Sequence, residues 1–393
     1  MDFNQINQRR QTNSYKWDGQ SFYQMNPNAL PLWVADMDFM TDPKIIEILN
    51  QKVSAGIFGY TFESDAYYQA IIDWMNRRHN YKIQADWIVT TPGVVSAIHI
   101  ALLAYTNEKD AILIQRPVYY PFTRAINLTG RTVINSPLVY DSSSLTYQVN
   151  LIDFEEKIID NQVKMFILCN PHNPIGKVFT STELKAMADI CLKHQVIIVS
   201  DEIHMDFVYQ PAKHHVLSNL DEAYGLNSII CTSTSKTFNL AGLKTSNIII
   251  QNPEFRQRFM HQLDYVGMHA STFFGTAATE AAYTYGDDYV NQLLVYLKAN
   301  LDYCDDFLKK YLPMLKRVKS EGLYLIWVDC RELHMDHLKL EDFMINNAEL
   351  WLDQGYIFGD EGQGFIRINL ACPKATIELA LNRLKKAIET LNR

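Results

Sequence analysis

Short β-branched runs alternate with helix-forming stretches along much of the chain, and this alternation limits the possible folds more than any other feature. A strand is expected at Trp87–Thr90, followed by the turn Thr91-Pro92-Gly93 and an apolar helix at Val94–Tyr105. Val196–Val199 is apolar throughout, which is typical of a strand buried on both faces of a parallel sheet. Repeated strand–helix units predict a three-layer α/β/α domain with a mostly parallel sheet. Further strands are expected at Ala111–Gln115, Arg131–Asn135, Lys164–Cys169 and Ile248–Ile250.

The C-terminal part predicts a smaller α/β domain that folds back on the first. We expect an N-terminal segment at 1–43 that packs with the small domain, a large domain at 44–286 and the small domain at 287–393. Within the small domain we expect helices at Asp288–Leu312, Leu340–Gln354 and Thr376–Leu391, and strands at Gly322–Val328 and Phe365–Leu370.

Composition and charge exclude several classes of function. The 393 residues carry 36 basic and 44 acidic side chains, and the resulting net charge of −8 argues against a nucleic-acid partner. The six cysteines lack zinc-type spacing, so we expect reduced core thiols and no metal site. No apolar run reaches membrane-spanning length, and the N-terminus lacks a signal pattern. We therefore expect a cytoplasmic protein with no membrane partner.

Lys236 is the most unusual candidate residue, because it stands at a strand end in the run Thr232-Ser233-Thr234-Ser235-Lys236. Burial lowers the pKa of a lysine and makes its amine a nucleophile. Hydroxyl groups and a second cation, Lys244, are suited to holding a phosphate. An amine beside a phosphate cradle indicates pyridoxal phosphate held as a Schiff base. The alternative is a surface Ser/Thr loop with an ordinary lysine.

Other candidate groups stand at the carboxyl ends of predicted strands, where open α/β sheets bind ligands. Asp201 ends a buried strand and could pair with a protonated ring nitrogen, although a helix cap or a solvated acid is the alternative. Tyr119 lies between two prolines and could stack on a flat cofactor. The helix that starts at Val94 and Val95 points free N–H groups at any phosphate there.

Three further features have both a functional and a structural interpretation. Arg367 is flanked by apolar residues, so it could bind a carboxylate or form a structural ion pair. The segment Leu30–Phe39 contains two aspartates among apolar residues, and it could cover a site or pack along the surface. Tyr60 follows a glycine turn and could contact a ligand or be an ordinary tyrosine.

Taken together, these residues resemble the fold-type I pyridoxal-phosphate enzymes, whose fold is that of the aspartate aminotransferases. The resemblance covers nearly the whole chain and rests on Asn173-Pro174-Ile175-Gly176, on Asp201 with His204, on Ser233 with Lys236, and on Arg367. Within this superfamily the chain is most similar to the class I/II aminotransferase-like cystathionine β-lyases of the MalY/PatB group. The narrower resemblance rests on the segments 33–39, 56–60, 116–122, 201–206 and 235–244.

The resemblance implies a role for each matching residue. Lys236 would be the Schiff-base lysine and the base that takes the Cα proton, and Asp201 would pair with the pyridinium nitrogen. Asn173 would donate to the phenolic oxygen of the ring, His204 would lie near it, and Tyr119 would stack on the ring face. The remaining implied contacts are Ser233, Lys244, Val94 and Val95 to the phosphate, Tyr60 to the phosphate of the neighbouring subunit of a homodimer, and Arg367 with the backbone of Ala35 to the substrate carboxylate.

The implied reaction is carbon–sulfur β-elimination from L-cystathionine or a related cysteine S-conjugate, which yields a thiol, pyruvate and ammonia. An aminotransferase acting on aromatic or other amino acids would use the same residues up to loss of the Cα proton, so it remains an alternative. A regulatory protein that binds a ligand or partner on the same fold is an alternative of another class.

Overall fold

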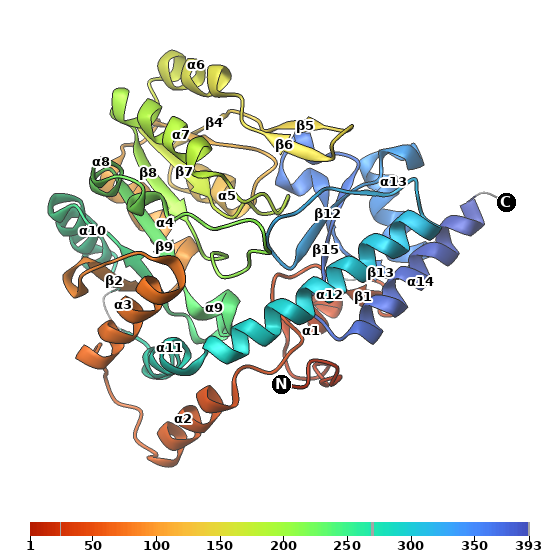
Figure 1. Cartoon of the computed structure of the whole chain (residues 1–393), viewed down its shortest axis with the longest axis horizontal. Helices are drawn as coiled ribbons and strands as arrows, with labels where there is room; N and C mark the ends of the chain where they lie inside the picture. The colour runs from red at the N-terminus through yellow and green to blue at the C-terminus, as the bar shows by residue number, and fades with distance from the viewer. Residues whose placement is uncertain (24, 269–270, 392–393) are drawn as a thin grey trace.

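A seven-stranded sheet forms the centre of the computed structural model, which describes residues 1–23, 25–268 and 271–391 (Figure 1). Only β10 runs antiparallel to its neighbours in this sheet, and the other neighbouring pairs are parallel. The mostly parallel sheet predicted from the sequence is therefore confirmed. In spatial order the strands are β2 (Ile88–Thr91), β10 (Ser246–Ile249), β9 (Ser228–Thr232), β8 (Ile197–Asp201), β7 (Met165–Cys169), β3 (Ala111–Ile114) and β4 (Thr132–Asn135).

Successive side chains of a strand point to opposite faces of the sheet, so the buried strands present apolar side chains on both faces. Helices cover both of these faces. On β8, for example, Ile198 belongs to one apolar cluster and Val199 to another. The three-layer prediction is confirmed. The second cluster includes side chains of α4 (Val94–Tyr105), α5 (Pro121–Leu128) and α10 (Pro253–Tyr265), while the first includes those of α3 (Asp65–His79), α6 (Leu151–Asn161), α7 (Ser181–Lys193), α8 (Glu222–Leu226) and α11 (Phe273–Tyr285).

The C-terminal part adds a four-stranded antiparallel sheet and long helices. Its strand order is β11 (Lys316–Arg317), β12 (Leu325–Asp329), β15 (Phe365–Asn369) and β14 (Asp353–Gln354). The helices are α12 (Asp287–Tyr311), α13 (His337–Asp342) and α14 (Lys374–Leu391). The remaining elements are α1 (Tyr15–Phe22), α2 (Pro43–Ser54), α9 (Thr234–Thr237), β1 (Leu30–Pro31), β13 (Leu350–Trp351), β5 (Val139–Asp141) and β6 (Thr146–Gln148).

The predicted helix at Leu340–Gln354 is wrong in its second half. α13 ends at Asp342, one turn of π-helix follows at Phe343–Asn347, and the chain then forms β13 and β14. The cause is tertiary: β13 pairs in parallel with β1, and β14 pairs with β15. These backbone partners override the helical spacing of the apolar residues.

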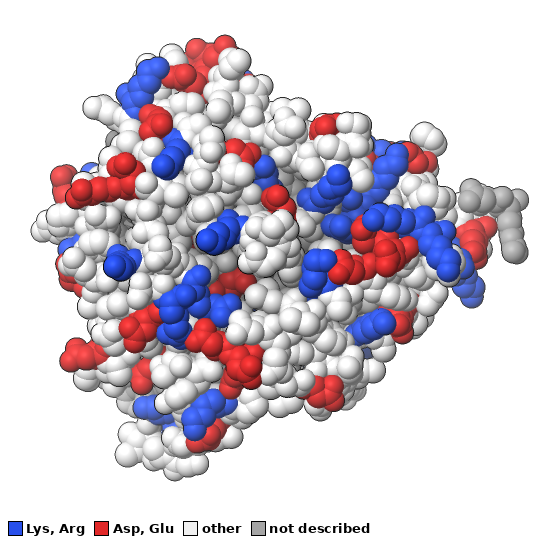
Figure 2. Space-filling model, in the orientation of Figure 1, with Lys and Arg blue, Asp and Glu red and all other residues white. Residues whose placement is uncertain are grey.

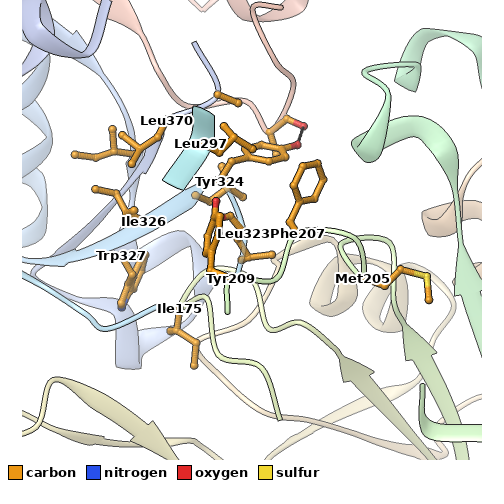
Figure 3. Close-up of a cluster of buried hydrophobic side chains, with 14 of the residues drawn as sticks. Ile175, Met205, Phe207, Tyr209, Leu297, Leu323, Tyr324, Ile326, Trp327 and Leu370 are labelled. Atoms are coloured by element: carbon orange, nitrogen blue, oxygen red, sulfur yellow. Dashed lines mark hydrogen bonds between the residues drawn. The ribbon is translucent and has the colours of Figure 1, made fainter. Parts of the chain in front are cut away.

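The two main parts of the chain share one apolar cluster, shown in Figure 3. Phe207 and Tyr209 follow the central sheet, and they lie beside Leu297 of α12 and beside Tyr324 and Ile326 of the C-terminal part. Packing of this kind fixes how the two parts face each other. The boundaries near residues 43 and 286 stay predictions.

The charged side chains on the surface and the state of the cysteines agree with the sequence analysis. Basic and acidic side chains are interspersed over the face shown in Figure 2. All six cysteines are free and buried, as predicted. Among the described helices none is both long and apolar enough to cross a bilayer.

Gly176 provides a test of this packing. Its backbone has φ +71°, and an added Cβ would lie 2.4 Å from the Cβ of Ser320 and 2.9 Å from the carbonyl oxygen of Gly322. Gly176→Ala should therefore lower the free energy of unfolding by about 2 kcal/mol or more, because of backbone strain and overpacking. Urea unfolding of the purified variant measures this change.

Gly242→Ala is the matched control, since an added Cβ there meets no heavy atom of the described residues within 4 Å. We expect its stability to stay within about 0.5 kcal/mol of the wild type. Equal stability of the two variants would contradict the packing described for Gly176.

Candidate active site

A cavity of 260 Å³ lies at the carboxyl ends of β7, β8 and β9. This is the sheet edge at which open α/β folds bind ligands. Most of the predicted site residues line it, although they are far apart in the sequence. The lining includes Ala35, Val94, Val95, Tyr119, Asn173, Asp201, His204, Lys236 and Lys244, together with Ser235 and Thr245.

Lys236 reaches the cavity from α9, a four-residue helix directly after β9. Its Nζ donates a hydrogen bond to the carbonyl oxygen of Ala35 at 2.7 Å. Burial, helped by the charge of Arg367, lowers the pKa of Lys236 to about 8, although Asp36 and Asp201 act in the opposite direction. A substantial fraction of the amine is therefore neutral near pH 8, as a nucleophile or a base requires.

Asp201 is the last residue of β8 and is almost completely buried. Its Oδ1 accepts a hydrogen bond from the backbone N–H of Ile203 at 3.2 Å. Burial raises the pKa of Asp201 to about 7, and Glu202 adds to the rise while Lys236 opposes it. A cation in the cavity would stabilise the ionised carboxylate, which is the environment that a protonated ring nitrogen needs.

His204 and Tyr119 present neutral groups to the same cavity. Burial and the nearby cations Lys236 and Arg367 keep the pKa of His204 well below its usual value. Its Nδ1 is buried and has no hydrogen-bond partner within the described residues. Burial raises the pKa of Tyr119, and its backbone N–H donates to the carbonyl oxygen of Asn173 at 3.0 Å.

Another set of groups that line the cavity is suited to an anion. Gly93, with φ 154°, directly precedes α4, so the first N–H groups of that helix, at Val94 and Val95, lie beside the cavity. Lys244 and Ser235 line the same cavity. Ser233 does not line it: its Oγ accepts from the backbone N–H of Ser235 at 3.1 Å and lies 2.7 Å from the carbonyl oxygen of Thr245. A phosphate role for Ser233 stays a prediction.

Arg367 lies behind Asn173 in the centre of β15 and is buried. Its Nη1 donates to Oδ1 of Asn173 at 2.8 Å, and its Nη2 donates to the carbonyl oxygen of Trp33 at 2.9 Å. Nη2 also forms an ion pair with Asp353, so the structural alternative considered for Arg367 is present too. Nε has no partner among the described residues.

Sequence reasoning missed two of these contacts. Asp353 lies opposite Arg367 in the register of β14 and β15, and directly opposed residues of an antiparallel pair share one face of the sheet. Tyr324 donates its hydroxyl to the carbonyl oxygen of Ala35 at 3.0 Å, the atom that also accepts from Lys236. Neither contact has a local sequence signal, because each depends on strand register or domain packing.

Tyr60 lies apart from the other predicted site residues. It is fully exposed and does not line the cavity of this chain.

The chain is similar to known proteins over nearly its whole length. Residues 28–384 match the family "Aminotransferase class I and II". The chain belongs to the class I and II aminotransferase family. This family member is 36% identical to cystathionine β-lyase PatB of Bacillus subtilis (strain 168) over 388 residues, covering 99% of this chain and 100% of PatB. It is 32% identical to protein MalY of Escherichia coli (strain K12) over 392 residues, covering 99% of each protein.

A solved structure shows the same fold at close similarity. Cystalysin from Treponema denticola, whose crystal structure contains pyridoxal 5′-phosphate, superposes with a TM-score of 0.96 at 38% identity and 99% coverage of both chains. The resemblance seen in the sequence is therefore confirmed for the family, for the fold and for the MalY/PatB group.

The residues of this class I and II family member fit the predicted cofactor. The cavity offers a buried carboxylate at Asp201, an Nδ1 of His204 that has no partner among the described residues, and an amine at Lys236 whose pKa is lowered. An anion-binding helix start lies beside Val94. These groups match the ring nitrogen, the ring substituents, the aldehyde and the phosphate of pyridoxal phosphate.

The buried carboxylate predicts a pH-dependent stability of the cofactor-free protein. The pKa of Asp201 rises on folding from 3.8 to about 7, so its ionisation destabilises the fold increasingly as the pH rises from about 4 to 7. Asp201→Asn should therefore stabilise the cofactor-free protein by about 2–4 kcal/mol at pH 8 and by much less at pH 4.5. Urea unfolding at both pH values measures this difference.

Asp189→Asn is a suitable control, because Asp189 accepts from the Tyr224 hydroxyl in a part-buried site outside the cavity lining. A gain from Asp201→Asn that is equal at the two pH values would contradict a raised pKa of Asp201.

Proposed function

We propose that this protein is a pyridoxal-phosphate-dependent carbon–sulfur β-lyase that cleaves L-cystathionine or related cysteine S-conjugates to a thiol, pyruvate and ammonia. The observation that carries the proposal is the cavity in which Lys236, Asp201 and Asn173 meet, with Arg367 directly behind Asn173. The similarity to cystathionine β-lyase PatB over the whole chain supports the choice of reaction.

The proposed role of each side chain follows from its charge. Arg367 and the backbone around Ala35 would bind the α-carboxylate of the amino acid; among the described residues the buried Nε of Arg367 has no partner. Lys244 and the start of α4 would hold the phosphate of the cofactor. Asp201 would stabilise positive charge on the ring nitrogen, and Tyr119 would stack on the ring.

Lys236 would move the proton. Pyridoxal phosphate supplies an electron sink when bound. The lowered pKa of Lys236 leaves its amine able to accept a proton from Cα near neutral pH. A thiolate at Cβ then leaves, and hydrolysis of the remaining fragment gives pyruvate and ammonia. The neutral side chains of His204 and Tyr119 do not compete for this proton.

An aminotransferase remains the second candidate, because the matching family is that of the class I and II aminotransferases. The two functions differ in whether a leaving group departs or a keto acid takes up the amino group. A regulatory protein without turnover is a third candidate, which the same assay tests.

Lys236→Ala tests the proposal. Wild-type protein reconstituted with pyridoxal phosphate and supplied with L-cystathionine should release equal amounts of thiol and pyruvate without an added keto acid. Lys236→Ala should lower kcat by about 10³-fold or more, because it removes the acid–base group, and it should lose the visible absorption band of the lysine-bound cofactor.

Lys185→Ala, a change in α7 outside the cavity lining, is the control for effects of mutagenesis and purification, and it should keep wild-type activity. Keto-acid-dependent turnover of the wild type without thiol would favour the aminotransferase, and absence of any turnover would favour the regulatory protein. Either result would contradict the lyase.

We also propose that the protein is a cytoplasmic homodimer in which each subunit contributes Tyr60 to the site of its partner. Ile57, Phe58, Tyr60 and Phe62 are all well exposed in a segment without helix or strand, with Phe62 80% exposed. Adjacent exposed apolar side chains of this size are typical of a subunit contact. The six free thiols support a reducing compartment.

Two variants separate the parts of this proposal. Phe62→Asp should convert the dimer to a monomer in sedimentation analysis, because it would bury an unpaired carboxylate at the contact. Tyr60→Phe should leave the dimer intact and weaken cofactor binding by about tenfold, the value of one hydrogen bond to a charged group. Leu379→Asp, at another exposed apolar position, is the control. A monomeric wild type would contradict the shared site.

A further inference from the structure

Residues 33–39, which we call the strap, pass through the site and contact the side chains that carry its chemistry. The carbonyl oxygen of Ala35 accepts from Lys236 Nζ at 2.7 Å and from the Tyr324 hydroxyl at 3.0 Å. The carbonyl oxygen of Trp33 accepts from Arg367 at 2.9 Å. The position of the strap therefore bears on both the lysine and the arginine.

Two asparagines bind the strap to both main parts of the chain. Asn239, three residues after Lys236, accepts from the N–H of Met37 at 3.0 Å and donates to its carbonyl oxygen at 2.9 Å. Asn369, two residues after Arg367, donates to the carbonyl oxygens of Val34 and Asp36 at 2.6 and 2.7 Å. The strap thus bridges the segment that carries Lys236 and the strand that carries Arg367.

The two aspartates of the strap are bound by cations from the first sixteen residues. Arg9 lies 2.7 Å from Oδ2 of Asp36 and 2.6 Å from Oδ1 of Asp38. Lys16 lies 2.8 Å from Oδ2 of Asp38, and its side chain is 0% exposed. The indole N–H of Trp17 donates to Asp38 at 2.8 Å. We call Arg9, Lys16, Asp36 and Asp38 the ion quartet.

The ion quartet is poorly explained as a source of stability alone. Buried ion pairs contribute little net free energy, because desolvation offsets their attraction. Although burial opposes it, Lys16, Trp17 and Arg9 together keep the pKa of Asp38 low, so the carboxylate stays charged. Short charge-assisted hydrogen bonds are directional, and they fix the geometry of the groups they join. The quartet can therefore define the register of the strap.

We propose that Arg9 and Lys16 are positioning residues that hold the strap, through Asp36 and Asp38, where Ala35 meets Lys236 and Trp33 meets Arg367. The consequence for catalysis rests on the proposed function of Lys236 and Arg367. The elements expected to hold the cofactor phosphate, Lys244 and the start of α4, have no hydrogen bond to the strap within the described chain. Substrate binding should therefore depend on the quartet more than cofactor binding does.

Lys16→Met tests the proposal in the full-length protein. It keeps an unbranched apolar side chain of similar volume, removes the ammonium group and leaves Asp38 with weaker neutralisation. Hydrogen exchange of the amides of Met37 and Asp38 in the cofactor-free protein should become at least about tenfold faster, since the buried pair is broken. Amides of β8 should exchange as in the wild type. In the reconstituted protein, KM for the amino-acid substrate should rise by about tenfold, while cofactor affinity changes less than about twofold.

Two further variants keep the test decisive. Arg9→Gln should act in the same direction, and its partly exposed position makes it the variant to use if Lys16→Met does not fold. Lys298→Met removes an exposed ion pair with Asp302 and should change neither readout. Unchanged exchange at 33–39 in the folded variants would overturn the proposal, and so would faster exchange with unchanged KM and kcat.

Failure of the proposed function gives a different result. A wild type that releases no thiol would overturn the lyase, yet exchange at 33–39 and the affinity of the reconstituted protein for L-alanine would still report on the quartet. Loss of L-alanine affinity in Lys16→Met with retained cofactor would then support the proposal, and retained affinity would contradict it.

Discussion

The site depends on the desolvation of two opposite charges at the carboxyl edge of the central sheet. Burial lowers the pKa of Lys236 to about 8 and raises that of Asp201 to about 7, so the two values approach each other. Pairs of titratable groups shifted in this way are typical of active sites. Dehydration of the amine and the carboxylate lowers the free energy of unfolding. A bound cofactor would restore part of that free energy by supplying a positive charge for Asp201.

The central sheet can hold such a site because helices pack against both of its faces. β8 is flanked by β7 and β9, so its end is defined by backbone hydrogen bonds on either side. Asp201 is thereby fixed opposite Cys169 and Cys231, and the cavity opens just beyond. A rigid strand end and short following segments position the functional groups better than long loops would.

Much of this arrangement could be predicted from the sequence, because its signals are local. Apolar runs located β3, β7 and β8, and α7 begins with a capping box formed by Thr180 and Glu183, which is also a local signal. Asp201 and Lys236 were found because a charged residue after an apolar strand is costly without a use. Strand order, the antiparallel direction of β10 and the end of α13 could not be predicted, since each depends on partners distant in sequence.

Arg367 shows where local reasoning reaches its limit. The sequence left a carboxylate clamp and a structural ion pair as alternatives; the structure contains the ion pair with Asp353 beside a hydrogen bond to Asn173, and the clamp stays a proposal. A guanidinium has five N–H donors, and the contacts to Asn173, Trp33 and Asp353 engage three of them. Both hydrogens of Nη2 are used, so the contacts among the described residues leave only the Nε–H and one hydrogen of Nη1 unengaged.

The ion pair between Arg367 and Asp353 would also affect the binding of a carboxylate by Arg367. Burial raises the pKa of Asp353, although Arg367 opposes the rise, so part of the attraction of Arg367 already serves to keep Asp353 charged. If Arg367 binds a substrate carboxylate as proposed, that carboxylate would compete with Asp353 for the same cation or bind beside it. The opposition of Asp353 and Arg367 in the β14–β15 register would therefore affect the strength of the carboxylate site proposed at Arg367.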